Sequence, residues 1–273
     1  MVKQHECWIK LYCKDSRNMC EVEDNSVQLV VTSPPYYDLK DYNSEDKFNQ
    51  IGNINNYNEY IEALNRVWEE CVRVLNPDGK ICINIMPIFL SSKESDYSRR
   101  ATKLVITDIE RFMESTGKMF LQALYIWDKR KIVRFSSFGS YPYPPNIFST
   151  FPFEWIIVFS KKGKRKKVNK NIKEASKISR KEWQDWAINS IWEMQPARAK
   201  EIGHPAPFPE ELPKRLIKLY SFVGDTVLDP FAGSGTTLLV ANMLLRNAIG
   251  YEINKEYVDI ANNRLSSINY RLF

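Results

Sequence analysis

The chain has 273 residues, enough for one large α/β domain or two small ones, and 44% of them are hydrophobic, as in an ordinary globular protein. No apolar stretch reaches the roughly 18 residues of a membrane span, and the first six residues are not followed by the apolar core of a signal peptide. We therefore expect a cytoplasmic protein with no membrane partner.

The net charge of +6 is unevenly distributed. Residues 161–181 contain eleven Lys or Arg and one acidic residue, so this segment carries +10 and leaves −4 for the remainder. A concentrated basic segment on a mildly acidic body predicts a polyanionic partner. The alternative is a solvated, partly flexible surface loop.

The cysteines give no indication of a metal site. Five are present and none forms a CxxC pair: Cys7, Cys13, Cys20, Cys71 and Cys82. Structural zinc sites usually contain such pairs, so the sequence predicts no bound metal. A cluster of the first three cysteines with His5 is conceivable, but its spacing does not match the known zinc motifs.

The first half of the chain predicts alternating strands and helices. Residues 7–13 and 27–31 are predicted as short strands. Residues 57–75 carry apolar side chains at helical spacing, and Asn76-Pro77-Asp78-Gly79 is predicted to end this helix. Residues 80–86 then alternate as a strand, so the pattern predicts a right-handed crossover between parallel strands.

The stretch that follows the strand at 27–31 has the chemistry of an amine-binding corner. In Thr32-Ser33-Pro34-Pro35-Tyr36-Tyr37, the Ser33 hydroxyl and the Pro34 carbonyl can accept both N–H bonds of an exocyclic amino group. Tyr36 can stack on the ring that carries this group. The alternative is a strand that runs into a Pro-rich turn. The polar residues that follow, up to 56, suit either a loop that closes over the target or a long surface connection, with Gln50-Ile51-Gly52 as its anchored end.

The middle of the chain predicts a late pair of strands. Residues 103–116 are expected to form a helix, and residues 119–127 and 153–160 are expected to form strands. They are separated by an aromatic and Pro/Ser-rich stretch, residues 128–152. Two late strands joined by a long loop suit the antiparallel edge of a sheet.

A glycine-rich loop lies between a strand and a helix near the C-terminus. The sequence DPFAGSGTT starts at Asp229, after a strand at 225–229, and leads into an apolar helix at 236–246. Glycines let a ligand approach the backbone, and the helix N-terminus supplies free N–H groups. Glu252 ends the next strand 23 positions after Asp229, close to the spacing of about 20 residues that is known for ribose-binding acids.

Together these two stretches resemble the amino-group DNA methyltransferases that use S-adenosylmethionine. Ser33-Pro34-Pro35-Tyr36 is similar to the family's catalytic motif in the form typical of cytosine-N4 enzymes, and DPFAGSGTT is similar to its cofactor motif. The catalytic motif comes first and the cofactor motif last, as in the circularly permuted β group. The resemblance covers nearly the whole chain, except residues 128–152 and 161–190.

The resemblance implies an α/β fold of the Rossmann-like, S-adenosylmethionine-dependent methyltransferase type: a mixed, mostly parallel sheet with helices on both faces, in a single catalytic domain over residues 1–273. It implies the catalytic residues Ser33, Pro34, Pro35 and Tyr36. It implies the cofactor-binding residues Asp15, Phe208, Asp229, Pro230, Phe231, Ala232, Gly233, Ser234, Gly235, Thr236 and Glu252. Asp15 matches an acid that contacts the cofactor's adenine amino group, although it can equally cap a short helix. His204, near Phe208, is assigned no role.

Target recognition in the permuted family lies between the late strands and the cofactor segment. We therefore assign it to residues 161–200, with help from 128–150, where basic residues are interleaved with aromatic ones. The expected DNA-binding residues are Lys129, Arg130, Arg134, Lys161, Lys162, Lys164, Arg165, Lys166 and Lys167. Which of the two segments reads the bases stays open.

The implied reaction is methyl transfer to the exocyclic N4 amine of a cytosine flipped out of double-stranded DNA, in a restriction–modification system with a cognate endonuclease as candidate partner. Two alternatives stay open: adenine-N6 methylation, for which the family more often has Asp at the position of Ser33, and an inactive DNA-binding subunit. Methylation of protein glutamine uses Asn-Pro-Pro-Tyr, and cytosine-C5 methylation needs a Pro-Cys nucleophile that this chain lacks. Whether the protein is a monomer or a dimer is also open.

Overall fold

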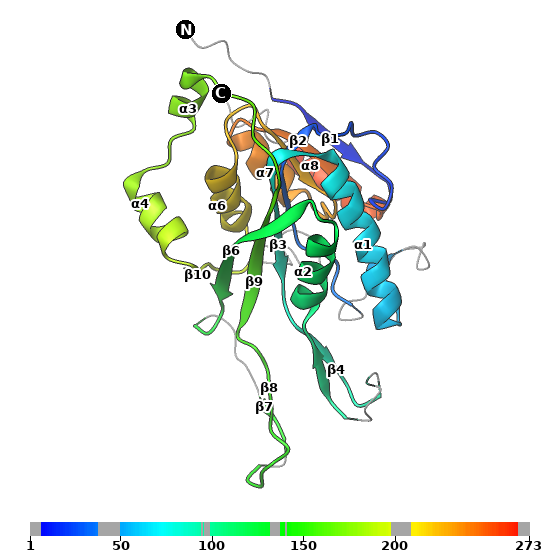
Figure 1. The fold of residues 1–273 in the computed structure, drawn as a ribbon. Coiled ribbons are helices and arrows are strands. Elements are labelled where there is room, and N and C mark those ends of the chain that lie inside the picture. The colour runs from blue at the N-terminus through cyan, green and yellow to red at the C-terminus, as the bar shows by residue number, and fades with distance from the viewer. Residues whose placement is uncertain are drawn as a thin grey trace.

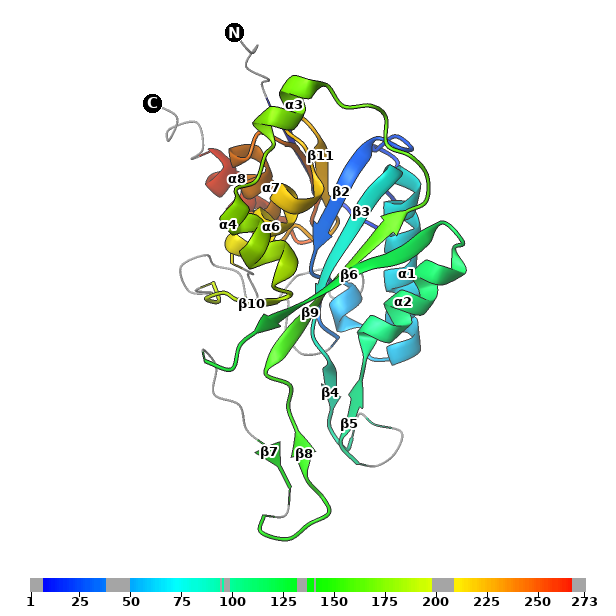
Figure 2. The same ribbon diagram turned by 60° about the vertical axis from the view of Figure 1, so that its left-hand side comes forward.

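A computed structural model of the protein describes residues 7–37, 50–93, 95, 99–131, 137–139, 141–197 and 209–266. Its centre is an eight-stranded sheet in the order β1-β12-β11-β2-β3-β9-β6-β10, with helices on both faces (Figures 1 and 2). The strands are β1 (Ile9–Tyr12), β2 (Val27–Thr32), β3 (Leu75–Ile85), β6 (Met119–Asp128), β9 (Phe153–Lys161), β10 (Ile191–Glu193), β11 (Thr226–Asp229) and β12 (Asn247–Tyr251). Within the described part of the sheet, β9 runs antiparallel to its neighbours β3 and β6, while the other paired strands are parallel.

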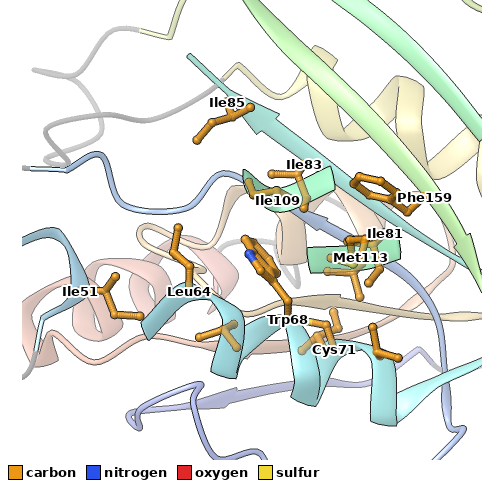
Figure 3. Close-up of a cluster of buried hydrophobic side chains, with 14 of the residues drawn as sticks. Ile51, Leu64, Trp68, Cys71, Ile81, Ile83, Ile85, Ile109, Met113 and Phe159 are labelled. Carbon is orange, nitrogen blue, oxygen red and sulfur yellow. The ribbon is translucent and has the colours of Figure 1, made fainter. Parts of the chain in front are cut away.

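Two groups of helices cover the sheet. The helical segments are η1 (Ile51–Asn53), α1 (Tyr57–Val74), α2 (Val105–Ser115), α3 (Lys170–Ala175), α4 (Arg180–Glu182), η2 (Trp183–Ile188), α6 (Glu211–Tyr220), α7 (Thr236–Met243) and α8 (Lys255–Ser266). One hydrophobic cluster lies under α1 and α2, and a second lies under α6 and α7 on the other face. Figure 3 shows the first cluster, in which Trp68 projects from α1 toward the side chains of β3 and α2, among them Ile83 and Ile109. This layered arrangement is the predicted fold class.

Helix α1 follows directly from its sequence. The Asn56 side chain caps the helix by accepting hydrogen bonds from the N–H groups of Asn58 and Glu59 at 2.9 and 3.2 Å. Its fully buried side chains recur at helical spacing: Tyr60, Leu64, Val67, Trp68 and Cys71. An amphipathic helix of this kind is stabilised mainly by the sheet face that it covers.

Two details of the sheet differ from the sequence prediction. Strand β3 starts at Leu75 instead of residue 80, because the Asn76–Gly79 stretch forms an irregularity in its pairing with β2, with Asp78 at a φ of 63°. The late strand pair is also not the edge of the sheet, because β10 adds outside β6. Trp192 of β10 is buried and stacks on Tyr125 of β6 at 4.5 Å between ring centroids, which explains this extra strand.

The sheet has two functionally distinct edges. The parallel strands end at one edge, which we call the carboxyl edge, and they start at the opposite one, the amino edge. Two hairpins extend beyond the carboxyl edge: β4 (Ile88–Leu90) with β5 (Ala101–Lys103), and β7 (Ser137–Phe138) with β8 (Phe148–Ser149). Because β9 runs in the reverse direction, it ends at the amino edge, and α3 lies on that side (Figure 1).

At the amino edge, the side chain of Lys161 turns inward and binds backbone carbonyls. Its ammonium group donates hydrogen bonds to the carbonyls of Val72 and Leu75 and to Asn25 Oδ1, at 2.7, 2.5 and 3.0 Å. Burial lowers the pKa of this ammonium below its usual range. Lys161 therefore satisfies carbonyls where α1 passes into β3.

We expect Lys161→Met to lower the free energy of unfolding by about 1–3 kcal/mol, because these oxygens lose their donor. Lys164→Met, at an exposed neighbouring position, is the matched control and should change it by less than about 0.5 kcal/mol. Urea titrations of both variants measure the difference. Equal effects would contradict the assigned role of Lys161.

Candidate active site

A pocket at the carboxyl edge brings the two sequence motifs together. One wall is the loop after β2, and the opposite wall is the loop between β11 and α7. The lining residues are Lys14, Asp15, Ser16, Ser33, Pro34, Pro35, Tyr36, Gln50, Ile51, Gly52, Pro230, Phe231, Ala232, Gly233, Ser234, Thr236, Tyr251, Glu252, Ile253 and Tyr257. Thr32 and Asp229 are 197 positions apart in the sequence, and the pairing of β2 with β11 brings them into contact.

Asp229 holds the two walls in register. Its buried carboxylate accepts hydrogen bonds from the hydroxyls of Thr32 and Thr237 at 2.7 and 2.6 Å and from the N–H of Phe231 at 3.0 Å. Burial raises the pKa of this carboxyl to about 6, and the three hydrogen bonds act in the opposite direction. Asp229 does not line the pocket, so its contribution to a ligand site is to position the two loops.

Glycines shape the loop between β11 and α7. Gly233 and Gly235 have φ values of 50° and 76°, in the left-handed region that favours glycine. A Cβ atom at Gly235 would lie 3.0 Å from the Cβ of Ala261 in α8, a tight contact that would push α8 slightly away. Arg264 of α8, which does not line the pocket, donates hydrogen bonds to the carbonyl and hydroxyl oxygens of Ser234. Gly233 and Ser234 line the pocket, whereas Gly235 lies behind it.

Glu252 places a buried carboxylate on the pocket wall. Its Oε2 accepts the N–H of Gly233 at 2.9 Å, and its Oε1 accepts the N–H of Asn254 at 2.8 Å. Burial raises the pKa of this carboxyl to about 7, and the neighbouring Asp229 charge adds to that rise. The hydrogen bonds from Gly233 and Asn254 lower it.

The loop after β2 is held by aromatic side chains. The Tyr60 hydroxyl of α1 donates to the carbonyl of Pro35 at 2.9 Å, and Tyr37 packs edge-on against the Tyr60 ring at 5.4 Å. Ser33 Oγ and the Tyr36 hydroxyl are 3.4 Å apart at the pocket wall. The amine-binding corner expected from sequence is therefore a fixed loop with its acceptor groups on the pocket.

Several lining residues were not identified from sequence. Tyr251 and Ile253 flank Glu252, Tyr257 belongs to α8, and Ile51 starts the short helix η1. Their signal was only their position next to predicted elements. The predicted Asp15 does line the pocket, and its carboxylate pairs with the Arg17 guanidinium. Phe208 and His204 lie outside the described residues.

The expected DNA-binding residues divide between the two edges. Lys129 and Arg130 are at the carboxyl edge, where they form ion pairs with Glu154 and Asp128. Residues 161–167 start at the amino edge and pass along it; Arg165 pairs there with Asp225. The structure therefore does not bring Lys161, Lys162, Lys164, Arg165, Lys166 and Lys167 next to the pocket. Arg134 lies outside the described residues.

The described part of the segment 161–200, residues 161–197, extends from one edge of the sheet to the other. Its first part follows the amino edge through α3, and α4 and η2 then lead back to β10 beside β6. The alternative segment, residues 128–150, leaves the carboxyl edge directly and carries the β7–β8 hairpin. The β7–β8 hairpin therefore lies at the same edge of the sheet as the pocket, whereas residues 161–167 lie at the opposite edge.

Among the described residues, no three His, Cys, Asp or Glu side chains come together as metal ligands, and the five cysteines are not in disulfides. In the same part of the chain, no helix has the length and apolar character needed to span a membrane.

The pocket fits S-adenosylmethionine. The Glu252 carboxylate, directly after β12, can accept hydrogen bonds from hydroxyl groups of the ligand, and the glycine-rich loop allows close approach to the backbone. Ile253 and Tyr257 line the same pocket and can form apolar walls for a flat ring. A Rossmann-like sheet with this pocket at its carboxyl edge is the arrangement expected for the class of S-adenosylmethionine-dependent methyltransferases.

The comparisons with known proteins identify the family within this class. A family model described as DNA methylase, N6_N4_Mtase, matches residues 27–263. The type II methyltransferase M.MjaI of Methanocaldococcus jannaschii is 34% identical over 285 residues, which cover 94% of this chain and 90% of the relative. The chain therefore belongs to the N6/N4 DNA methylase family.

Solved structures agree with this assignment. The putative DNA modification methylase TTHA0409 of Thermus thermophilus, in complex with S-adenosylmethionine, superposes with a TM-score of 0.75 at 30% identity, over 94% of this chain and 93% of that one. The PvuII cytosine-N4-specific DNA methyltransferase has a TM-score of 0.62 at 22% identity, over 94% of this chain and 86% of that one, which supports the fold alone. The protein is a DNA methyltransferase that uses S-adenosylmethionine.

The raised pKa of Glu252 predicts pH-dependent cofactor binding. An ionised carboxylate accepts hydroxyl protons more strongly than a protonated carboxyl, which has lost part of its acceptor capacity, so the affinity for S-adenosylmethionine should fall as the pH drops below about 7, by up to about tenfold per pH unit. Calorimetric titrations between about pH 6 and 8.5 measure this slope. Glu252→Gln should bind more weakly and lose the slope, whereas Asp229→Asn should keep it. A slope that persists in Glu252→Gln would contradict the assignment.

Proposed function

We propose that this methyltransferase acts on the exocyclic N4 amine of a cytosine that is flipped out of double-stranded DNA. The observation that carries the proposal is the joint pocket, in which Ser33, Pro34 and Tyr36 face the same space as Gly233 and Glu252. A reacting base inside a duplex is out of reach of such a pocket, so it must leave the stack, at a cost of a few kcal/mol.

The chain's own groups act on the amine. The nitrogen lone pair of an exocyclic amine is conjugated into the ring, which makes it a poor nucleophile. Hydrogen bonds accepted by Ser33 Oγ and the Pro34 carbonyl favour a pyramidal nitrogen with its lone pair free. Tyr36 stacks on the base and contributes about 1–3 kcal/mol toward the cost of flipping. S-adenosylmethionine would supply an electrophilic methyl group when bound, and positioning with electrostatics carries the transfer without a covalent protein intermediate. The methylated nitrogen then loses one N–H proton to solvent.

Serine at position 33 favours cytosine over adenine. In the family that the motif resembles, Ser is typical of cytosine-N4 enzymes and Asp is more frequent at the corresponding position of adenine-N6 enzymes. Adenine-N6 methylation is the second candidate, since the same acceptors suit either amine. An inactive DNA-binding subunit is disfavoured by the complete pocket; a calorimetric titration without S-adenosylmethionine binding would support it.

We propose that the duplex lies against the carboxyl edge and contacts the segment from Lys129 to Pro152. The described β7–β8 hairpin of this segment protrudes beyond the carboxyl edge, where the pocket lies (Figure 2), and exposes large side chains: Tyr141, Tyr143 and Ile147 are 97%, 73% and 70% exposed. Exposed aromatic side chains suit contacts with bases and sugars. The basic residues 161–167 start at the opposite edge, so we propose the segment 128–150, which our sequence-based assignment gave a supporting part, in place of 161–200 as the main recognition region.

The biological setting is inferred from relatives. M.MjaI is named a type II methyltransferase, so we propose a restriction–modification system with a cognate endonuclease that acts on the same site. The cytoplasmic location stays a prediction.

The double variant Ser33→Ala with Tyr36→Ala should keep cofactor binding and lose methyl transfer by at least about 100-fold, because it lacks one amine acceptor and the stacking ring. Calorimetry measures the first property, and incorporation of labelled methyl groups into DNA measures the second. Full activity of this variant would refute the proposed role of the loop.

Two substitution sets compare the candidate DNA surfaces. Tyr141→Ser with Tyr143→Ser should weaken DNA binding by about 30-fold and leave cofactor binding unchanged, since each ring is expected to contribute about 1 kcal/mol. Lys164→Gln, Lys166→Gln and Lys167→Gln together should change DNA affinity and its salt dependence much less. Fluorescence anisotropy at several salt concentrations measures both. A flattened salt response in the lysine variant would restore the amino edge as the DNA surface.

A further inference from the structure

We infer that Glu154 is a positioning residue that fixes the direction of hydrogen bonding at Ser33, acting through the Tyr36 hydroxyl. The inference rests on the proposed function, because it concerns how Ser33 receives the target amine. Sequence analysis gave Glu154 no role, and it is the second residue of β9, at the carboxyl edge.

Glu154 is an acid inside an apolar strand. Its side chain is buried, and a buried carboxylate is costly unless charged and polar donors satisfy it. The Lys129 ammonium pairs with Oε1, and the Asn84 side-chain amide donates to Oε2. Lys129 also lies over the Trp127 ring, 4.1 Å from its centroid, which holds the ammonium in place. Residues of β3 and of the end of β6 thus converge on one carboxylate of β9.

A third donor, from the loop after β2, reaches Glu154 Oε2, the oxygen that also accepts from Asn84. The Tyr36 hydroxyl lies 3.4 Å from Glu154 Oε2 and 3.4 Å from Ser33 Oγ. Both distances are long for O–H···O bonds, and catalytic hydrogen bonds often shorten when substrate binds. The arrangement is a chain of three oxygen groups that runs from Glu154 through Tyr36 to Ser33.

The carboxylate determines the direction of this chain. An ionised carboxylate can only accept, so Tyr36 must donate its proton toward Glu154. The Tyr36 oxygen is then an acceptor, and the Ser33 hydroxyl donates its proton to it. The lone pairs of Ser33 Oγ are thereby left for the N–H of the target amine. No proton is transferred along the chain.

This direction matters because serine is both a donor and an acceptor. With its proton turned toward the amine, Ser33 would oppose the hydrogen bond that the reaction needs. An aspartate at this position would accept without help. Glu154 therefore holds Ser33, through Tyr36, in the acceptor role, because a serine hydroxyl could otherwise turn its proton toward the amine.

The test is a double-mutant cycle. Glu154→Gln keeps the side-chain shape but can present an N–H to Tyr36, and Tyr36→Phe keeps the stacking ring but removes the hydroxyl. Each should lower kcat by about 10- to 100-fold, with the affinities for S-adenosylmethionine and duplex DNA within about twofold of wild type. Since both act on the same chain, the double variant should match Tyr36→Phe alone.

Matched controls separate positioning from folding. Asp259→Asn makes the same carboxylate-to-amide change in an exposed ion pair with Lys255 of α8 and should leave kcat and Tm unchanged. An unchanged kcat in Glu154→Gln, or effects that multiply in the double variant, would overturn the inference. If Glu154→Gln does not fold, Tyr36→Phe decides, since undiminished kcat in that variant excludes the chain. Wild-type protein that labels no DNA would refute the proposed function instead.

Discussion

The structure depends on one buried carboxylate, that of Asp229. Its hydrogen bonds to Thr32, Thr237 and Phe231 join the end of the catalytic strand to the start of the cofactor loop. Burial raises the pKa of this carboxyl to about 6, so the group favours the folded state most at a pH below its unfolded value of about 4, and this contribution is lost as the pH rises through about 6. The loss at neutral pH is on the order of 3 kcal/mol, a stability cost that accompanies a fixed distance between the two halves of the pocket.

The second constraint is the direction of β9. Because it alone is reversed among the paired strands of the described sheet, it starts next to the catalytic loop and ends at the amino edge. Its first residues therefore bring Glu154 to Tyr36, while the basic segment that follows Lys161 lies at the opposite edge. The sheet so separates the catalytic chemistry from the strongest concentration of positive charge.

Much of this architecture could be predicted from local patterns. Helical spacing gave α1 almost to the residue, and the motifs at Ser33 and Gly233 indicated the two walls of the pocket. The position of residues 161–167 could not be predicted, because it depends on long-range pairing of β9 with β3 and β6. Strand β10 was missed since three residues are too few for periodicity, and only the buried contact of Trp192 reveals it. Glu154 had one signal, a charge within an apolar run.

The central claim is that the corner formed by Ser33, Pro34 and Tyr36 accepts the amine of a flipped cytosine. Duplex DNA of varied sequence, incubated with the protein and methyl-labelled S-adenosylmethionine and then digested to nucleosides, tests it most directly. The account predicts label in N4-methylcytosine. Label in N6-methyladenine would keep the fold and the amine chemistry but show that Ser33 does not select cytosine, and would contradict the claim.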